Sequence, residues 1–373
     1  MRKTKIIATI GPASQNPAIL EQLIASGIDC ARLNFSHGTL EQHGQIIRDI
    51  RRISQDQGRK VAILQDLGGI KLRLGEIQGV IELALGDLVS LVPEKTSPRA
   101  GVLPFPQPGV IRNLRAGNQV FIADGSVRLE VLEANGSEVK TVVRDGGAIS
   151  SFKGVNLPGV AIDQPVLTPE DEVALRFGLE QGVDWVAVSF VRSAEDIQYA
   201  RDALNRIGSK ALLMAKLERA EGVDNLDSIL AGVDGVMVAR GDMGVELPME
   251  RVPVIQKEVV RKASRSGRIS AIATQMLMSM VLAPAPTRAE VSDVTNAVLD
   301  GCDAIMLSDE TAVGKHPIEA VKVADATIRE AETIYPYHKD LDPHDRTQAI
   351  AAAADGLVRS LGSKPIVITS TGR

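Results

Sequence analysis

Short apolar runs alternate with amphipathic helical patterns along most of the chain. Such alternation is typical of βα units that build a parallel sheet. The runs predict strands at residues 5–10, 30–33, 61–64, 185–188, 211–215, 235–238, 269–273 and 304–307. Eight strands with intervening helices predict a (β/α)8 TIM barrel of class α/β. The alternative, an open doubly wound sheet, requires a GxGxxG segment after its first strand, and residues 10–14 do not match it.

The region 74–159 interrupts this pattern between the third and fourth strands. Residues 127–131 and 139–143 alternate apolar and polar side chains, as half-buried strands do, and Asn135-Gly136 between them indicates a hairpin turn. We therefore expect an inserted small β-barrel domain. A domain at this point in the chain would cover the barrel mouth as a lid and exclude water. A purely structural insertion is the alternative.

The last part of the chain predicts the beginning of another domain. Residues 336–346 are polar and rich in turn formers, 349–361 show a helical pattern, and 365–369 are typical of a buried strand. The expected organisation is barrel at 1–73 and 160–335, lid at 74–159, and an incomplete C-terminal α/β domain at 336–373. No internal repeat is evident.

Composition limits the possible partners. Hydrophobic residues make up 44% and charged residues 24% of the chain, as in soluble globular proteins. An aromatic content of 3% and a net charge of -5 argue against a nucleic-acid partner. Cys30 and Cys302 form no CxxC pair, and no apolar run has the length of a signal or a membrane span. We expect a cytoplasmic protein with no membrane partner.

Polar residues gather just past the predicted strands. Residues 211–218 show this most clearly: an apolar run ends in Lys216, and Glu218 follows on the same side because successive side chains of a strand alternate. Alone, this could be a surface ion pair at a strand edge. The other strands, however, lead into Arg32, Asn34, Ser36 and His37; Asp66; Ser189; Arg240, Gly241 and Asp242; Thr274 and Gln275; and Ser308 and Glu310. In a barrel these positions converge on one face, which predicts a site there.

The residue types in this group indicate phosphoryl transfer. Glu218 and Asp242 are hard oxygen ligands that suit Mg2+ or Mn2+. Gly241 would let backbone N–H groups approach an anion closely. Positive charge for phosphate or carboxylate groups comes from Arg32, Arg73, Lys153, Lys216 and Arg240. Phosphoryl transfer requires mainly metals, cations and positioning, and a hydroxyl near a proton-accepting carbon would join it to enolate chemistry.

The chain resembles the pyruvate kinase family from its first residues to its last. Matching segments include Arg-Leu-Asn-Phe-Ser-His-Gly at 32–38 and Ala-Arg-Gly-Asp-Met-Gly-Val-Glu at 239–246. Further matches lie at 3–12, 152–159, 215–218, 273–277 and 286–293. The resemblance implies the last step of glycolysis, in which phosphoenolpyruvate and ADP give pyruvate and ATP.

The resemblance also implies roles for single residues. Lys216 would stabilise the transferring phosphoryl group and the enolate, while Glu218 and Asp242 would hold the divalent metal. Thr274 would lie near the proton-delivery path and, with the backbone of Gly241 and Asp242, hold the substrate carboxylate. The phosphate would face Arg32 and Arg73, and the nucleotide would contact Asn34, His37, Arg73 and Lys153.

Residues 66–73 depart from the family pattern. The family's monovalent-cation site uses the equivalents of Asn34, Ser36 and Asp66 together with a threonine, which here is Leu67. Lys71 stands where most members have glutamate, as in potassium-independent members, and its ammonium would replace the charge of K+. We therefore expect activity without K+. Asp309 and Met278 also differ from the common Gly and Glu, and these changes could alter metal or nucleotide affinity.

The chain ends early relative to the family. Residues 369–373 resemble the start of a loop that binds sugar-phosphate effectors, so we expect no effector control, and homo-oligomer formation through barrel surfaces. Two competing hypotheses are a non-catalytic truncated subunit and a metal-dependent lyase or aldolase that acts on pyruvate or phosphoenolpyruvate. Such a lyase would require neither Lys153 nor the lid.

Overall fold

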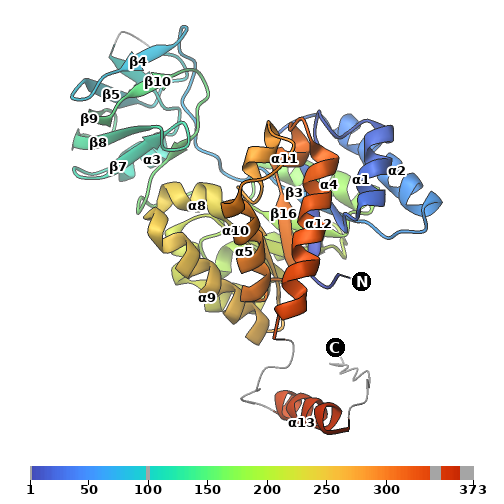
Figure 1. The fold of residues 1–373 in the computed structure, drawn as a ribbon. Helices are drawn as coiled ribbons and strands as arrows, with labels where there is room; N and C mark the ends of the chain where they lie inside the picture. Colours follow the sequence, from blue (N-terminus) through green and yellow to red (C-terminus); the bar gives the residue numbers. More distant parts are fainter. Residues whose placement is uncertain (1, 98–100, 337–345, 362–373) are drawn as a thin grey trace. The chain divides into compact units, whose positions relative to one another are not determined.

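The structure is a computed structural model that describes residues 2–97, 101–336 and 346–361 (Figure 1). Its described residues fall into two units, one up to Glu332 and one from Thr333 onward. The first unit contains all the strands of the described residues.

Eight parallel strands close into a barrel, as the sequence predicts. They are β1 (Lys5–Thr9), β2 (Cys30–Asn34), β3 (Ala62–Asp66), β12 (Trp185–Val188), β13 (Leu212–Leu217), β14 (Gly235–Ala239), β15 (Ile269–Ala273) and β16 (Ala304–Leu307). Their order around the barrel is β1-β16-β15-β14-β13-β12-β3-β2. Four strands end later than expected, namely β2 at Asn34, β3 at Asp66, β13 at Leu217 and β14 at Ala239. Asn34, Asp66 and Lys216 therefore belong to the barrel wall rather than to the loops beyond it.

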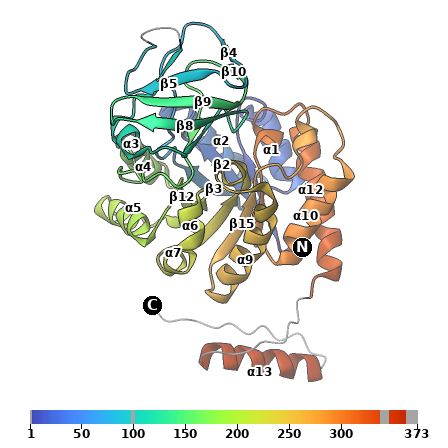
Figure 2. The same ribbon diagram turned by 90° about the vertical axis from the view of Figure 1, so that its left-hand side faces the viewer.

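Helices surround this barrel (Figures 1 and 2). They are α1 (Pro17–Ser26), α2 (Leu40–Asp56), α4 (Pro169–Gln181), α5 (Ala194–Arg206), α6 (Ala220–Asp224), α7 (Leu226–Gly232), α8 (Arg240–Glu246), α9 (Val252–Arg265), α10 (Arg288–Asp300), α11 (Asp309–Ala312) and α12 (Pro317–Ile334), with 3-10 turns η1 (Met249–Arg251) and η2 (Met278–Val281). Asn16 and Thr168 cap α1 and α4 through their side-chain oxygens, each followed by a proline at the first helical position.

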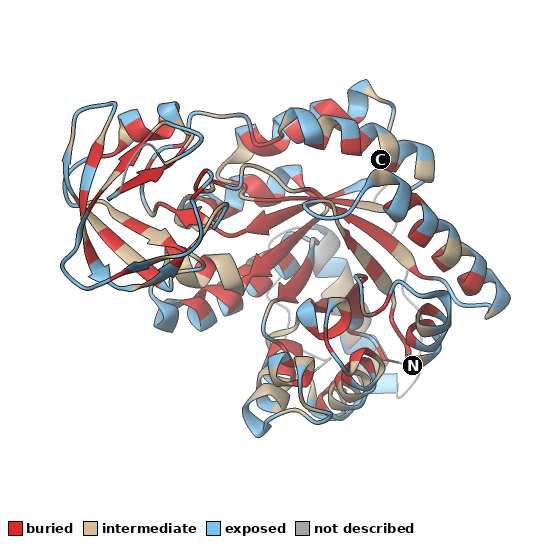
Figure 3. Ribbon diagram, turned by 90° about the horizontal axis from the view of Figure 1, so that it is seen from above, coloured by how far each residue is buried: buried red, intermediate tan, exposed pale blue. Residues whose placement is uncertain are grey.

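The barrel strands are buried on both faces (Figure 3). One face of each strand packs against the helices, and the other fills the barrel interior. The interior cluster contains Ile7, Leu64, Ala187, Met214, Met237, Ala271, Ala273, Ala304 and Met306. Because side chains alternate along a strand, this cluster fixes which later residues also point inward. Lys216 lies two residues after Met214, and Asp66 lies two residues after Leu64.

A short motif of glycine, an apolar residue and aspartate precedes every second barrel strand. Its copies lie at 27–29, 182–184, 232–234 and 301–303, before β2, β12, β14 and β16. In each copy the aspartate accepts a backbone N–H bond at 2.7 to 2.9 Å from the start of the preceding strand, and the donors are Ile6, Ile63, Leu213 and Ser270.

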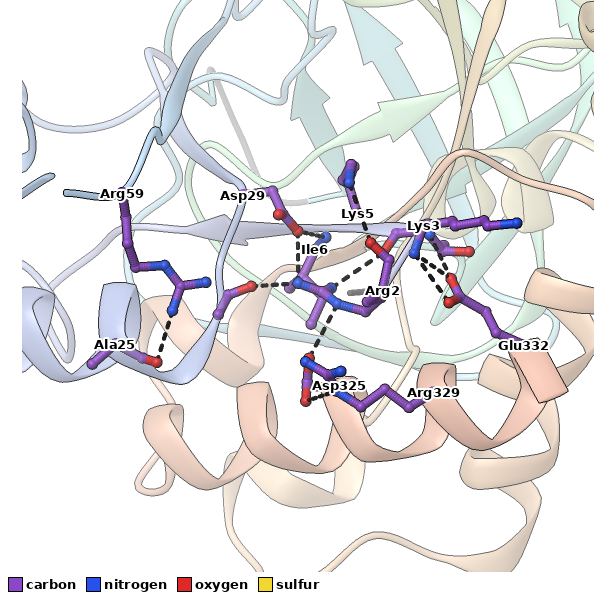
Figure 4. A network of polar contacts seen from close by, with 12 residues as sticks. Arg2, Lys3, Lys5, Ile6, Ala25, Asp29, Arg59, Asp325, Arg329 and Glu332 are labelled. Carbon is purple, nitrogen blue, oxygen red and sulfur yellow. Dashed lines mark hydrogen bonds and ion pairs between the residues drawn. The ribbon is translucent and has the colours of Figure 1, made fainter. Parts of the chain in front are cut away.

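The first copy of this motif also ties the N-terminus to the last barrel helix (Figure 4). The guanidinium of Arg2 lies 2.7 Å from Asp29 and 3.1 Å from Asp325, which belongs to α12. The backbone N–H groups of Lys3 and Thr4 both donate to Glu332. These contacts connect β1, β2 and α12 at the N-terminal end of the barrel.

The inserted region forms a curled six-stranded sheet and a two-stranded sheet, ordered β11-β7-β8-β9-β5-β6 and β10-β4. The elements are β4 (Ile81–Leu83), β5 (Leu88–Val92), β6 (Val102–Pro104), α3 (Pro108–Asn113), β7 (Gln119–Ile122), β8 (Val127–Ala134), β9 (Val139–Asp145), β10 (Gly147–Ile149) and β11 (Val155–Asn156). The predicted hairpin joins β8 to β9, where the side chain of Asn135 accepts hydrogen bonds from Ser137 and Glu138. A separate apolar core fills this region.

The second unit contains helix α13 (Arg346–Leu361), which agrees with the helix predicted at 349–361. The strand predicted at 365–369 and the effector-like loop at 369–373 lie outside the described residues. Among the residues that are described, no helix combines the length and hydropathy needed to cross a bilayer.

Candidate active site

A layer of polar side chains lies inside the barrel at the C-terminal ends of its strands. It contains Thr9, Arg32, Asp66, Ser189 and Lys216, which come from or directly follow β1, β2, β3, β12 and β13. These five strands are neighbours around the barrel. Strand periodicity alone places their last inward positions side by side, so the sequence forms this layer without any irregular backbone.

Lys216 is at the centre of the layer and is only 8% exposed. Its Nζ lies 2.7 Å from Ser189 Oγ, 3.0 Å from Glu218 Oε1 and 3.2 Å from Asp66 Oδ1. Burial by itself would lower the pKa of Lys216, but the carboxylates of Asp66 and Glu218 outweigh burial and raise that pKa. The ammonium is therefore held charged in a nearly water-free layer.

Asp66 joins Lys216 to Arg32. Its Oδ2 lies 2.6 Å from Nε of Arg32, whose Nη1 donates to the Thr9 hydroxyl at 3.0 Å. Burial opposes ionisation of Asp66, but Lys216 and Arg32 together lower its pKa below the ordinary value. The sequence analysis missed Thr9, although its position two residues after the inward-facing Ile7 could have identified it.

Glu218 connects the buried layer to the barrel mouth. Its Oε2 accepts a hydrogen bond of 2.7 Å from the backbone N–H of Phe190, which has a positive φ of 56°. Burial raises the pKa of Glu218, Lys216 opposes that shift, and Asp242 and Asp66 add to it. Of the two carboxylates that add to the shift, Asp242 has the larger effect on the pKa of Glu218.

A cavity of about 910 Å³ lies past the C-terminal ends of β14, β15 and β16, and its lining includes neither Glu218 nor any of the five residues of this layer. Eight of the residues named in the sequence analysis line it, namely Lys71, Arg240, Gly241, Asp242, Thr274, Gln275, Ser308 and Glu310. The lid contributes Asn118, Gln119, Phe121 and Asp124 among others, and the two unusual residues Met278 and Asp309 also lie on its wall. The cavity thus lies between lid and barrel, with cationic, anionic and hydroxyl groups on its surface.

The backbone at Gly241 and Thr274 is shaped by their close contact. Thr274 has a φ of 77° and Gln275 a φ of 56°, in the left-handed region that β-branched residues rarely adopt. A Cβ at position 241 would lie 2.8 Å from Thr274 Cγ2. Only glycine leaves room for Thr274 in this conformation, which explains why the Arg240-Gly241-Asp242 segment contains it.

The predicted nucleotide residues lie in two other places. Arg73 and Lys153 belong to the two chain segments that lead into and out of the lid, where Leu74 N donates to Lys153 O at 2.9 Å and Arg73 donates to Phe152 O at 3.0 Å. Asn34 is the last residue of β2, and His37 lies three residues beyond it. None of the four is among the residues that line the cavity.

The residues predicted for a monovalent-cation site have their oxygens largely engaged. The side chain of Asn34 accepts a hydrogen bond of 3.1 Å from Ser36 N, and both carboxylate oxygens of Asp66 face cations. Leu67 is 1% exposed and offers no hydroxyl. Lys71, by contrast, has an exposed side chain on the cavity wall.

Several contacts that fix the lid to the barrel were not found from the sequence. Asn156 donates to Glu246 at 3.3 Å, and Glu246 lies on the cavity wall. In the segment that leads from the lid back to the barrel, Arg219 donates to the carbonyl of Val160 at 3.2 Å, and Arg192 to that of Gln164 at 3.0 Å. Carbonyl acceptors leave no signal in the sequence, so these pairs could not be predicted.

Comparisons with known proteins agree with the predicted family. A family model described as the barrel domain of pyruvate kinase matches residues 1–321. The chain is 41% identical to a pyruvate kinase from Agrobacterium vitis, over 99% of this chain and 78% of the relative, and 42% identical to pyruvate kinase 2 from Synechocystis sp., over 100% and 64%. The crystal structure of a pyruvate kinase from Cryptosporidium parvum has a TM-score of 0.91 and 35% identity, covering 97% of this chain and 77% of that one. The chain thus spans 64% to 78% of the lengths of these proteins.

The buried layer makes Asp66 important for stability. Replacing Asp66→Asn leaves two cations without their shared carboxylate, and breaking a buried pair in this way costs about 3 kcal/mol or more of unfolding free energy. The matched control is Asp145→Asn, because the Arg128–Asp145 pair has the same 2.6 Å distance but is exposed, so its loss costs below about 1 kcal/mol. Urea unfolding of both variants measures the difference. Equal losses would contradict the assigned role of burial.

Proposed function

Because the chain belongs to the pyruvate kinase family of phosphotransferases, we propose that it transfers the phosphoryl group of phosphoenolpyruvate to ADP and releases pyruvate and ATP. The observation that carries the proposal is the ammonium of Lys216, held charged beside Glu218 at the mouth of a closed barrel. A fixed cation in a nearly dry site stabilises both the transferring phosphoryl group and the enolate that remains.

In this reaction Lys216 would face the phosphoryl group, with Arg32 and Arg73 on its other oxygens. The backbone of Gly241 and Asp242 would bind the substrate carboxylate, and Thr274 would lie on the path of the proton that converts the enolate to pyruvate. The nucleotide would extend toward Asn34, His37 and Lys153. The position of Gly241, Asp242 and Thr274 on one cavity wall supports the substrate part of this assignment.

Glu218 and Asp242 would hold one Mg2+ or Mn2+ ion. Both are hard oxygen donors. Burial and the charge of Asp242 raise the pKa of Glu218, and a divalent cation would offset the repulsion between the two carboxylates. The metal would supply positive charge beside the transferring group. Among the described residues no cluster of three or more His, Cys, Asp or Glu side chains is arranged as a metal site, so substrate oxygens and water would complete the coordination.

We also propose that Lys71 replaces K+. The engaged oxygens of Asn34 and Asp66, and the missing hydroxyl at Leu67, support this proposal because they leave few ligands for a monovalent ion.

The exposed hydrophobic side chains of Met249 and Val254 support assembly through barrel surfaces, and the free cysteines Cys30 and Cys302 support a cytoplasmic location. The family matches favour neither a lyase nor a non-catalytic subunit.

Removing the Lys216 ammonium tests the reaction. In an assay coupled to lactate dehydrogenase with phosphoenolpyruvate, ADP and Mg2+, Lys216→Met is expected to lower kcat by about 100- to 1,000-fold, the usual effect of losing a preorganised electrostatic group. Lys210→Met is the matched control, since it removes the same charge just before the other end of β13 and should leave turnover unchanged. No turnover by the folded wild-type chain would overturn the proposed reaction.

Sugar phosphates added to this assay should leave turnover unchanged.

Reversing the charge of Lys71 tests the role of K+. The wild-type chain should turn over equally well with and without K+. Lys71→Glu is expected to lower turnover in K+-free buffer by about tenfold, or about 1.4 kcal/mol of barrier, and added K+ should recover part of this loss. Lys60→Glu, at an exposed position before the other end of β3, controls for the charge reversal itself. Strong K+ activation of the wild type would rule out the replacement.

A further inference from the structure

The turn that follows β15 is held in an unfavourable conformation. Thr274 and Gln275 both have positive φ values, 77° and 56°. Each non-glycine residue in such a conformation costs about 1–3 kcal/mol, so the turn persists only where its surroundings hold it. Without such contacts, Thr274 would relax and its hydroxyl would move away from the cavity wall.

Arg240 makes the contacts that hold Thr274. Its Nη2 donates to the backbone carbonyl of Thr274 at 2.7 Å and its Nε at 3.2 Å, so the guanidinium binds this oxygen in a forked manner. The same guanidinium lies 2.7 Å from Asp293 of α10, and its side chain is only 13% exposed. Asp293 therefore fixes the orientation of the guanidinium that binds the Thr274 carbonyl.

Two carboxylates hold the next residues of the turn. Glu310 accepts the backbone N–H of Leu277 at 2.9 Å, and Glu290 accepts that of Ser279 at 2.6 Å. These contacts begin three residues after Thr274. Within the described residues, Arg240 alone donates to the carbonyl of Thr274 itself, and Arg240 directly precedes Gly241 in the chain.

We propose that Arg240 is a positioning residue for the reaction, which sets the place of the Thr274 hydroxyl through the Thr274 carbonyl and is itself oriented by Asp293. The inference rests on the proposed function, because that function gives Thr274 its part in proton delivery. Arg240 then affects the reaction by positioning Thr274 and not through its own positive charge. A displacement of a reacting group by about 1 Å can cost about 100-fold in rate, so this contact can matter without touching substrate.

Two substitutions separate geometry from charge. Arg240→Lys keeps the positive charge but cannot form the fork, and Arg240→Met loses both. Both variants should lower kcat by about 10- to 100-fold, while KM for phosphoenolpyruvate rises less than kcat falls, because Thr274 also helps to hold the substrate carboxylate. Asp293→Asn should give a smaller loss in the same direction.

The matched control is Arg201→Lys. Arg201 also binds a backbone carbonyl, that of Gly232, and a carboxylate, Asp234, but at the N-terminal end of β14. This variant should keep wild-type kcat and KM. Amide hydrogen exchange reports the turn itself: Arg240→Lys should speed exchange at Leu277 and Ser279, and Arg201→Lys should not.

The kinetic and exchange results together decide the proposal. Faster exchange with unchanged kcat, or a raised KM with unchanged kcat, would overturn it, the latter because Arg240 would then only attract the substrate. Unchanged exchange in folded Arg240→Lys would overturn it as well. Inactivity of the wild type would overturn the proposed function, and hydrogen exchange would still show whether Arg240 holds the turn.

Discussion

The contacts of the buried Lys216 ammonium are the interactions on which the arrangement of the barrel mouth depends. Through Asp66, Arg32 and Thr9 on one side and Ser189 on the other, it belongs to a continuous set of polar contacts that crosses five neighbouring strands. Each charge is tolerated only because its partners are present, since an unpaired ion at this depth costs several kcal/mol. The same set of contacts therefore connects the barrel strands and fixes the positions of the site residues.

The cavity wall is organised differently from this layer. Its residues are held by backbone shape and by contacts behind them, as where Gly241 makes room for Thr274 and Arg240 grips the carbonyl of Thr274. Arg219 and Arg192 hold the segment that leads from the lid back to the barrel by donating to the carbonyls of Val160 and Gln164. The cavity wall thus includes side chains such as Arg240 and Glu310 that hold the neighbouring turn, whereas the groups in the layer pair with one another. Such preorganisation lets the protein stabilise developing charge without rearranging.

Much of this arrangement could be predicted from strand periodicity. The eight strands were identified because their apolar runs are short and regularly spaced, and the shared side of Lys216 and Glu218 follows from alternation. Contacts between distant residues could not be predicted, because register and loop conformation decide them: nothing near Thr274 in the sequence indicates its positive φ. For the same reason Asn34, His37, Arg73 and Lys153 were grouped with the site although none lines the cavity; their roles stay predictions.

Strand β14 shows why residue type alone does not identify a site. At its N-terminal end Arg201 pairs with Asp234 and binds a carbonyl, and just past its C-terminal end Arg240 pairs with Asp293 and binds a carbonyl. The first pair belongs to the ring of aspartates that accept backbone N–H groups, and it closes the barrel base. The second includes Arg240, which lies on the cavity wall and binds the carbonyl of a turn whose residues have positive φ values. The same types of contact therefore stabilise the barrel at the N-terminal end of β14 and position site residues at its C-terminal end. TIM barrels generally show this division between a stabilising face and an active-site face.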